Sequence, residues 1–379
     1  MADVESKELL GIAHNVHSPR HNAESVDGLD ERLKAYIYGE YDGGGVLAVA
    51  MHNNLVASSG REGGVKLFQL IGEGELKFVG DVPSLRRPLP GVTPTLVTCL
   101  KFDSMGRLFM GGADGLLRMA EFADDAQNME VAVISSPKQL EYRQAPSSVL
   151  SLDVSEELDM VASAHANGNV CVYSTTYHDN EGKSSTSSSG SIKTDCLLGV
   201  WNPFADTNNA CHARSVAFVS GGEEQDQQQQ QQTGDHDESK WSIVVGGGNG
   251  NLWMQEIHPS HKASPSNNEA PSTGSTTAQP LFKENTMQQI KPSHQGPVLS
   301  MASRPGGILG STSHDGMLRM SQLWPVPKPL YGLGGHKAWI GNVCIDREGK
   351  RLLSDGRDDI VVVHDFLTGE EEEEEVTDS

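Results

Sequence analysis

The stretch that decides the fold is Leu309-Gly310-Ser311-Thr312-Ser313-His314-Asp315-Gly316-Met317-Leu318-Arg319-Met320. Residues 309–313 are small and suit an extended strand. Leu318 and Met320 then alternate with Met317 and Arg319, which is the period of a second strand. Asp315-Gly316 is a strong hairpin signal, because glycine reaches positive φ without steric cost and an aspartate carboxylate bonds the nearby backbone. The stretch therefore predicts strand, tight turn, strand.

The same pattern recurs along the chain, in six units that each place an acid or amide in the turn. These turn residues are Glu62, Asp114, Asn167, Asn249, Asp315 and Asp358. Polar low-complexity inserts near 178–192, 221–239 and 258–285 lengthen some of the intervals between them. Without the inserts, each unit approaches the ~40–50 residues of a four-stranded propeller blade. The sequence predicts an all-β propeller of four-stranded blades, with six repeats visible and seven blades as an open alternative.

The expected organisation has three parts: a flexible N-terminal segment (1–32), the propeller (33–366) and a disordered acidic tail (367–379) that contains the run Glu370 to Glu375. The sixth unit lacks a fourth strand, whereas Leu33 to Tyr41 reads as a lone strand at the other end of the chain. Because closed rings hide strand edges, we expect Leu33 to Tyr41 to pair with Ile360 to Asp365 and close the ring.

Composition excludes several classes of protein. The formal charge of −22 disfavours nucleic acid and anionic membranes as partners. Five cysteines without a CxxC pair argue for reduced thiols, and against a disulfide framework or a zinc knuckle. No signal peptide is visible, and no window approaches the ~18 apolar residues of a membrane span. We expect a cytoplasmic or nuclear protein, or one present in both compartments.

Metal and catalytic motifs are also missing from the sequence. His14, His17 and His21 have helical spacing, but Pro19 interrupts that helix and no cysteine or carboxylate completes a ligand set. There is no GxSxG, HExxH or phosphate-loop motif. We therefore expect no catalytic residue, no metal and no cofactor.

Several positions resemble the WD-repeat β-propeller family, over roughly residues 33–366. Its repeats carry Gly-His before the first strand, an acid in the turn before the third strand, and Trp-Asp at the end of that strand. Gly335-His336 is followed by Ile340, and His294 by Val298. The terminal Trp-Asp is degraded in every unit, as in His364-Asp365.

The resemblance implies that the turn acid joins a hydrogen-bond network with the histidine and a serine of the second strand. In the last unit these residues would be His336, Ser354 and Asp358. Asp315 and Asp114 are assigned to the same structural network in their own units. These residues are therefore expected to hold the fold together and not to catalyse a reaction.

The loops of a four-stranded meander alternate between the two ends of a blade, so all three inserts should lie on one face. The opposite face keeps short turns. There the turns carry Arg61, His165, His314 and Arg357, and a link between blades carries Trp339. In an acidic chain this local set of cationic and aromatic side chains predicts a surface that binds an acidic or phosphorylated segment of another protein.

Three functions remain open on the sequence. The first is a non-catalytic scaffold or adaptor that binds proteins through the short-loop face. The second is a substrate-recognition subunit of a ubiquitin ligase. The third, from a different class, is a propeller enzyme or metal-binding protein, which would place several carboxylates or histidines in the central channel.

Overall fold

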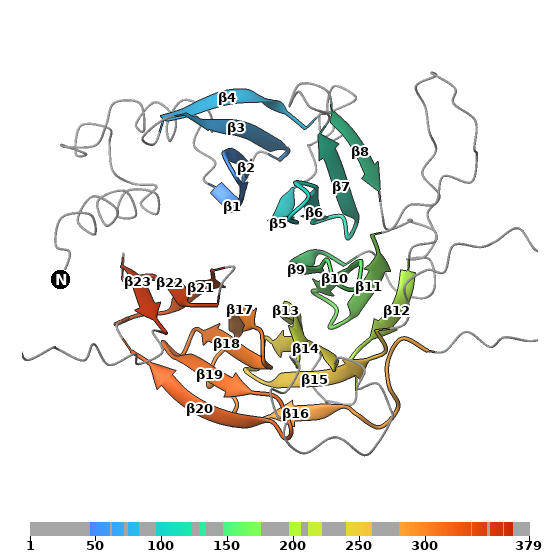
Figure 1. Cartoon of the computed structure of the whole chain (residues 1–379), viewed down its shortest axis with the longest axis vertical. Helices are drawn as coiled ribbons and strands as arrows, with labels where there is room; N and C mark the ends of the chain where they lie inside the picture. Colours follow the sequence, from blue (N-terminus) through green and yellow to red (C-terminus); the bar gives the residue numbers. More distant parts are fainter. Residues whose placement is uncertain are drawn as a thin grey trace, which may run out of the picture.

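The computed structural model describes residues 46–60, 63–71, 75–82, 96–122, 129–133, 147–175, 197–205, 211–221, 240–259, 280–334, 336–346, 349–358 and 360–366. Within these ranges the chain forms six antiparallel sheets and no helix. Figure 1 shows the sheets set around a common centre, each with its first strand innermost. The fold is an all-β, six-bladed propeller, as the repeats predicted.

The strands follow in chain order within each sheet. Sheet 1 holds β1 (Val46–His52), β2 (Leu55–Gly60), β3 (Val65–Ile71) and β4 (Glu75–Asp81), and sheet 2 holds β5 (Val97–Phe102), β6 (Leu108–Gly112), β7 (Leu117–Phe122) and β8 (Met129–Val133). Sheet 3 holds β9 (Val149–Ser155), β10 (Met160–His165), β11 (Val170–Ser174) and β12 (Leu197–Trp201), and sheet 4 holds β13 (Ala213–Ser220), β14 (Trp241–Gly247), β15 (Leu252–Ile257) and β16 (Gln288–Ile290). Sheet 5 holds β17 (Val298–Arg304), β18 (Ile308–Ser313), β19 (Leu318–Gln322) and β20 (Lys328–Leu333), and sheet 6 holds β21 (Ile340–Ile345), β22 (Arg351–Gly356) and β23 (Val361–Asp365).

The core is divided among the contacts between neighbouring sheets. Five clusters of buried side chains join sheets 1 and 2, 2 and 3, 3 and 4, 4 and 5, and 5 and 6. Between sheets 3 and 4, for example, Met160 and Val172 pack with Ile243 and Val245, all fully buried. Burial of each such side chain contributes about 1.5–3 kcal/mol. Each blade is therefore stabilised mainly by the blades beside it.

The turn of the opening stretch forms as expected. Gly316 has φ of 75° and its amide donates to the carbonyl of Ser313. The Asp315 carboxylate accepts from the amide of Met317 at 3.0 Å. Glycine is required at position 316 because a side chain there would be strained at positive φ, and the hairpin from β18 to β19 depends on that geometry.

The structure differs from the sequence expectations at the outer strands. The strands β16 and β20 were not predicted. Leu281 and Phe282, expected in an insert, instead belong to the fold: Leu281 is buried between sheets 3 and 4, and Phe282 pairs with Ile257. The proposed closing strand Leu33 to Tyr41 lies outside the described residues, and within them β23 is the outer edge of a three-stranded sheet.

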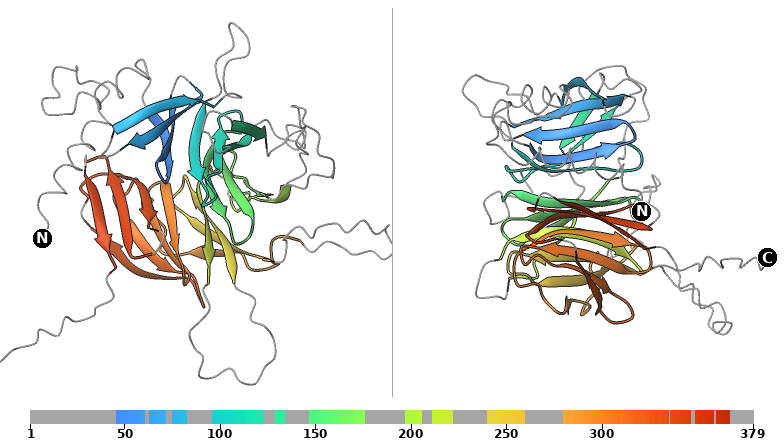
Figure 2. Two further views of the ribbon diagram at one scale, coloured as in Figure 1. Left: turned by 45° about the horizontal axis from the view of Figure 1, so that its top comes forward. Right: turned by 90° about the vertical axis from the view of Figure 1, so that its left-hand side faces the viewer.

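The two ends of the ring carry different connections. Figure 2 shows the strands running from one end of the ring to the other. The inserts interrupt the chain between β11 and β12, β13 and β14, and β15 and β16, which all lie at one end. We call the opposite end, which carries the turns between second and third strands, the short-loop face. The predicted segregation of inserts and short turns therefore follows from the strand order.

Candidate functional site

One residue in each innermost strand is left out of the pairing with the second strand. In sheet 4, for example, Ala213 pairs with Gly247 and Ser215 with Gly246, so that Arg214 has no partner. We call these residues the channel ring: Leu47, Thr98, Leu150, Arg214, Leu299 and Gly341. A bulge of this kind redirects a side chain, and here it gives each blade one residue at the centre of the ring.

Five of these residues, all except Gly341, line a cavity of about 230 Å³ at the short-loop end of the channel. Three are leucines, and the Thr98 hydroxyl already lies within bonding distance of the carbonyls of Gly111 and Val149. Arg214 is therefore the single charged group of this lining. Position 341 favours glycine, because a Cβ there would lie 2.8 Å from the Asp355 carboxylate. The amide of Asn342 donates to this carboxylate at 2.6 Å and so holds it in place.

Next to this opening, three predicted partner-binding residues come together. The ring of His314 stacks on Trp339 with centroids 4.1 Å apart and an interplanar angle of 24°. The Arg357 guanidinium lies 4.9 Å from the centre of the same Trp339 ring. Trp339 remains 44% exposed, so it can still contact a partner. We call these three residues the Trp339 cluster.

Two arginines, Arg214 and Arg357, act on His314 in this region. Burial lowers the pKa of His314, and the charges of Arg214 and Arg357 lower it further. A neutral imidazole can stack on Trp339 without adding a third charge. Among the residues that the structure describes, no carboxylate forms an ion pair with Arg214 or Arg357. In a chain of formal charge −22, two adjacent unpaired arginines favour an external anion.

The structural network suggested by the family resemblance is present in sheet 6. The Nδ1 atom of His336 lies 3.1 Å from the Asp358 carboxylate, and its Nε2 atom lies 2.9 Å from Ser354 Oγ. The Asp358 carboxylate also accepts from the amide of Lys337 at 2.6 Å. Burial alone would raise the pKa of Asp358, but this amide and His336 lower it below its usual value.

Sheet 5 repeats the network with His294, Ser311 and Asp315. His294 Nε2 lies 2.9 Å from Ser311 Oγ, and Nδ1 lies 3.0 Å from Asp315. Burial lowers the pKa of His294, although Asp315 opposes this shift. The neutral ring therefore donates from Nδ1 to the carboxylate and accepts at Nε2 from the serine hydroxyl. Ser313 bonds the Gly296 carbonyl instead, so Ser313, His314 and Asp315 do not form a reactive triad.

Two predicted site residues have roles that differ from the expectation. His165, expected on the binding surface, is only 3% exposed and lies 2.9 Å from Ser163 Oγ and 3.0 Å from the Ser147 carbonyl. His165 is thus the last residue of β10 and bonds a serine of the same strand, and its burial removes it from the surface. Asp114 pairs at 2.5 Å with Arg118, four residues later, and not with a histidine. Arg61 lies outside the described residues.

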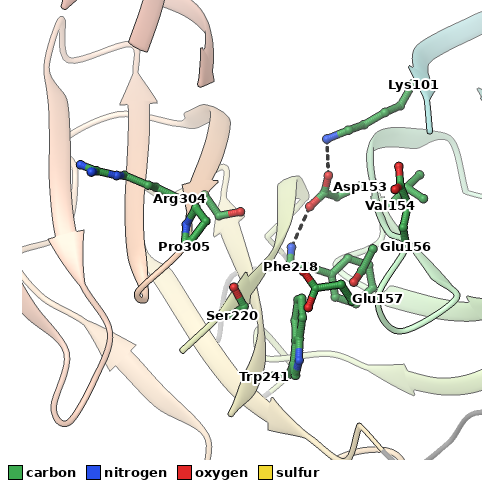
Figure 3. A pocket seen from close by; sticks show the side chains of 12 residues that line it. Lys101, Asp153, Val154, Glu156, Glu157, Phe218, Ser220, Trp241, Arg304 and Pro305 are labelled. Atoms are coloured by element: carbon green, nitrogen blue, oxygen red, sulfur yellow. Dashed lines mark hydrogen bonds and ion pairs between the residues drawn. The ribbon is translucent and has the colours of Figure 1, made fainter. Parts of the chain in front are cut away.

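A second cavity, of about 300 Å³, lies at the insert-bearing end (Figure 3). Its charges are largely satisfied within the chain: Asp153 pairs with Lys101 and accepts from the Phe218 amide at 2.8 Å. Arg304 points away from Asp153 in Figure 3, and its guanidinium lies 5.4 Å from the Phe366 ring centre. This cavity is internally bonded, whereas the channel ring presents an unpaired cation.

Arg214 is the functional candidate that the sequence did not reveal. It is the second residue of β13, which begins at Ala213. A comparison of the repeats contains a signal for Arg214. Each innermost strand begins with an apolar or small residue, and its second residue is Leu47, Thr98, Leu150 or Leu299 in four other units. An arginine among four uncharged equivalents would have marked the site.

Two other kinds of site are absent from the described part of the chain. No group of three or more histidine, cysteine, aspartate or glutamate side chains is placed to hold a metal there. Within the same ranges, no helix is long and apolar enough to cross a membrane.

Comparisons with known proteins add little to this geometry. No model of a known protein family matches the chain, and no curated protein matches it. One similar solved structure is that of the computationally designed Ika8 protein, with 16% sequence identity, a TM-score of 0.47, and coverage of 87% of this chain and 74% of that chain. The chain is thus identified by its architecture, a six-bladed all-β propeller.

Proposed function

We propose that this protein is a propeller of the WD-repeat type that acts as a non-catalytic scaffold and binds other proteins through its short-loop face. The histidine–serine–acid networks in sheets 5 and 6 support the WD-repeat assignment, because they occupy the positions that this family uses for them. The degraded Trp-Asp pairs do not weaken it, since the networks hold the blades without them.

The observation that carries the binding role is a pair of arginines near an exposed aromatic ring, neither of which forms an ion pair within the described residues. Arg357 lies over Trp339, and Arg214 stands at the channel opening beside it. Arginine and tryptophan are the residue types that most often dominate binding energy at protein interfaces. The preferred partner is an acidic or phosphorylated segment, whose charge these arginines attract.

A scaffold is favoured over an enzyme because the candidate catalytic groups are committed to structural bonds. The Asp315 carboxylate accepts from His294 and from the amides of Gln295 and Met317. Asp358 is held in the same way by His336 and Lys337. The channel ring contains no histidine or carboxylate, which an enzyme or metal site would place there.

The test is affinity capture from an extract of the native cells, with quantitative mass spectrometry. The double variant Trp339→Ala, Arg357→Glu should lose the specific partners of the wild-type protein. Arg351→Glu is the matched control, because Arg351 is exposed at the opposite end of β22, where it faces Asp365. Equal recovery of the same proteins by wild type and by the double variant would show that this face is not the binding surface.

A further inference from the structure

We propose that the channel ring binds the free C-terminus of a partner protein whose last residue is apolar, with Arg214 bonding the terminal carboxylate. This inference rests on the proposed function and names the part of the partner that enters the site. It begins from the chemistry of the ring, which combines three leucines with the guanidinium of Arg214, a group that forms no ion pair within the described residues.

The size of the cavity limits the ligand to about one residue. Its volume of about 230 Å³ is below the ~300–1,000 Å³ of pockets that enclose a whole small molecule. It corresponds to roughly seven or eight water molecules at ~30 Å³ each. One large apolar side chain can fill this space, whereas a helix or a folded loop cannot.

The position of the charge limits the ligand further. Arg214 occupies the same place in its strand as Leu150 and Leu299 do in theirs, so the anion and the apolar group must bind at similar depth. In an extended peptide, consecutive side chains point to opposite sides. An internal acid and its apolar neighbour would therefore point apart. A C-terminal residue carries its side chain and a carboxylate on one Cα, and so presents both together.

Residues around the channel ring can contact the part of the partner that precedes its C-terminus. Leu47 is 38% exposed, which leaves the ring open to solvent on the side of sheet 1. Trp339 and Arg357 lie outside the ring and can contact the preceding residues, where acidic side chains would be favoured. Asp355, which lies beside Gly341 of the ring, accepts from the backbone and side-chain amides of Asn342, and within the described residues it forms no ion pair with Arg214.

Direct binding of synthetic peptides tests this inference. The probes are fluorescent seven-residue peptides with two acidic residues before the last position, ending in leucine, phenylalanine, alanine or aspartate, each made as a free acid and as an amide. Fluorescence anisotropy with the full chain gives the Kd. Since a hydrogen bond to a charged group is lost, we expect the amides of the leucine and phenylalanine peptides to bind roughly 10- to 100-fold more weakly than the acids.

Variants of the ring separate this site from the rest of the face. Arg214→Gln should reduce binding of the free acids to the level of the amides, while Arg351→Gln, the same change at the opposite end, should leave both unchanged. Leu47→Glu is a second variant that leaves Arg214 intact: its carboxylate would compete for Arg214 and should weaken the free acids by a similar factor. Thermal unfolding of each variant checks that it is folded.

Two results would overturn the inference. One is equal affinity for acids and amides, or no binding of any peptide of the set. The other is tighter binding of an internal acidic or phosphotyrosine peptide with its C-terminus blocked. If capture of partners still depends on Trp339 and Arg357 in either case, the scaffold function stands and only the C-terminal recognition falls. If that capture is also unaffected, both fail.

Discussion

Replacement of His294 by alanine should destabilise the protein by about 2–3 kcal/mol. The His294 side chain is fully buried, with one nitrogen 2.9 Å from Ser311 Oγ and the other 3.0 Å from Asp315. A neutral hydrogen bond contributes about 0.5–1.5 kcal/mol, and one to a charged group about 1.5–3 kcal/mol. Together the two bonds contribute about 2–4.5 kcal/mol. We expect the lower half of this range, because in the variant Asp315 would still accept from the amides of Gln295 and Met317.

Urea unfolding monitored by tryptophan fluorescence and circular dichroism measures this cost as a shift of the midpoint at constant m. His258→Ala is the control, because the ring of His258 is half buried and makes no side-chain hydrogen bond within the described residues. It should change stability by less than about 0.5 kcal/mol. If the two variants are equally stable, the network does not hold sheet 5 together. A double-mutant cycle with Ser311→Ala should give a coupling of about 1 kcal/mol.

Four further outcomes are expected. His336→Ala should cost about 1–3 kcal/mol by the loss of the same two bonds in sheet 6, and an unchanged unfolding temperature would contradict that network. Stability measured in urea should fall as pH drops below ~6.5, because the pKa values of His165 and His294 are lowered in the folded state and the unfolded chain binds more protons there; a flat profile between pH 7.5 and 5.5 would exclude this. Gly246→Ala should destabilise by about 1–3 kcal/mol, since its Cβ would lie 2.4 Å from Ser215 Oγ and 2.6 Å from Val298 Cγ1, and wild-type thermal stability would refute it. Deletion of residues 1–45 should abolish cooperative unfolding if that segment covers the edge of β23, and an intact calorimetric transition would reject the proposed closure.

Sequence reasoning found three outermost strands, β4, β8 and β12, and the first three strands of every sheet. β14 and β18, for example, combine apolar and small residues and are almost wholly buried. The two missed strands lie at the rim. β20 is exposed along most of its length and contains Pro329, and β16 has three residues, of which two are glutamine. These two sequences lack the alternation of apolar and polar residues that marks a strand.

The candidate site was predicted only in part, because side-chain direction and strand register cannot be read from the local sequence. Turn residues such as His314 and Arg357 could be assigned to one face from the order of the strands. The direction of each side chain could not be predicted in this way, and His165 points inward to Ser163. Arg214 depends on a register shift between two strands, which is a property of the pairing and not of the local sequence.

The channel ring also separates ligand specificity from folding stability, two properties that are usually linked in a protein. Its six members are skipped by the strand pairing, and the buried clusters between the sheets do not include them. Exchange of Leu47, Leu150, Arg214 or Leu299 therefore alters the chemistry of the central opening while the blade behind it keeps its pairing and its packing. Over evolution, or by design, such a ring allows a change of ligand specificity at little cost in folding stability, one blade at a time.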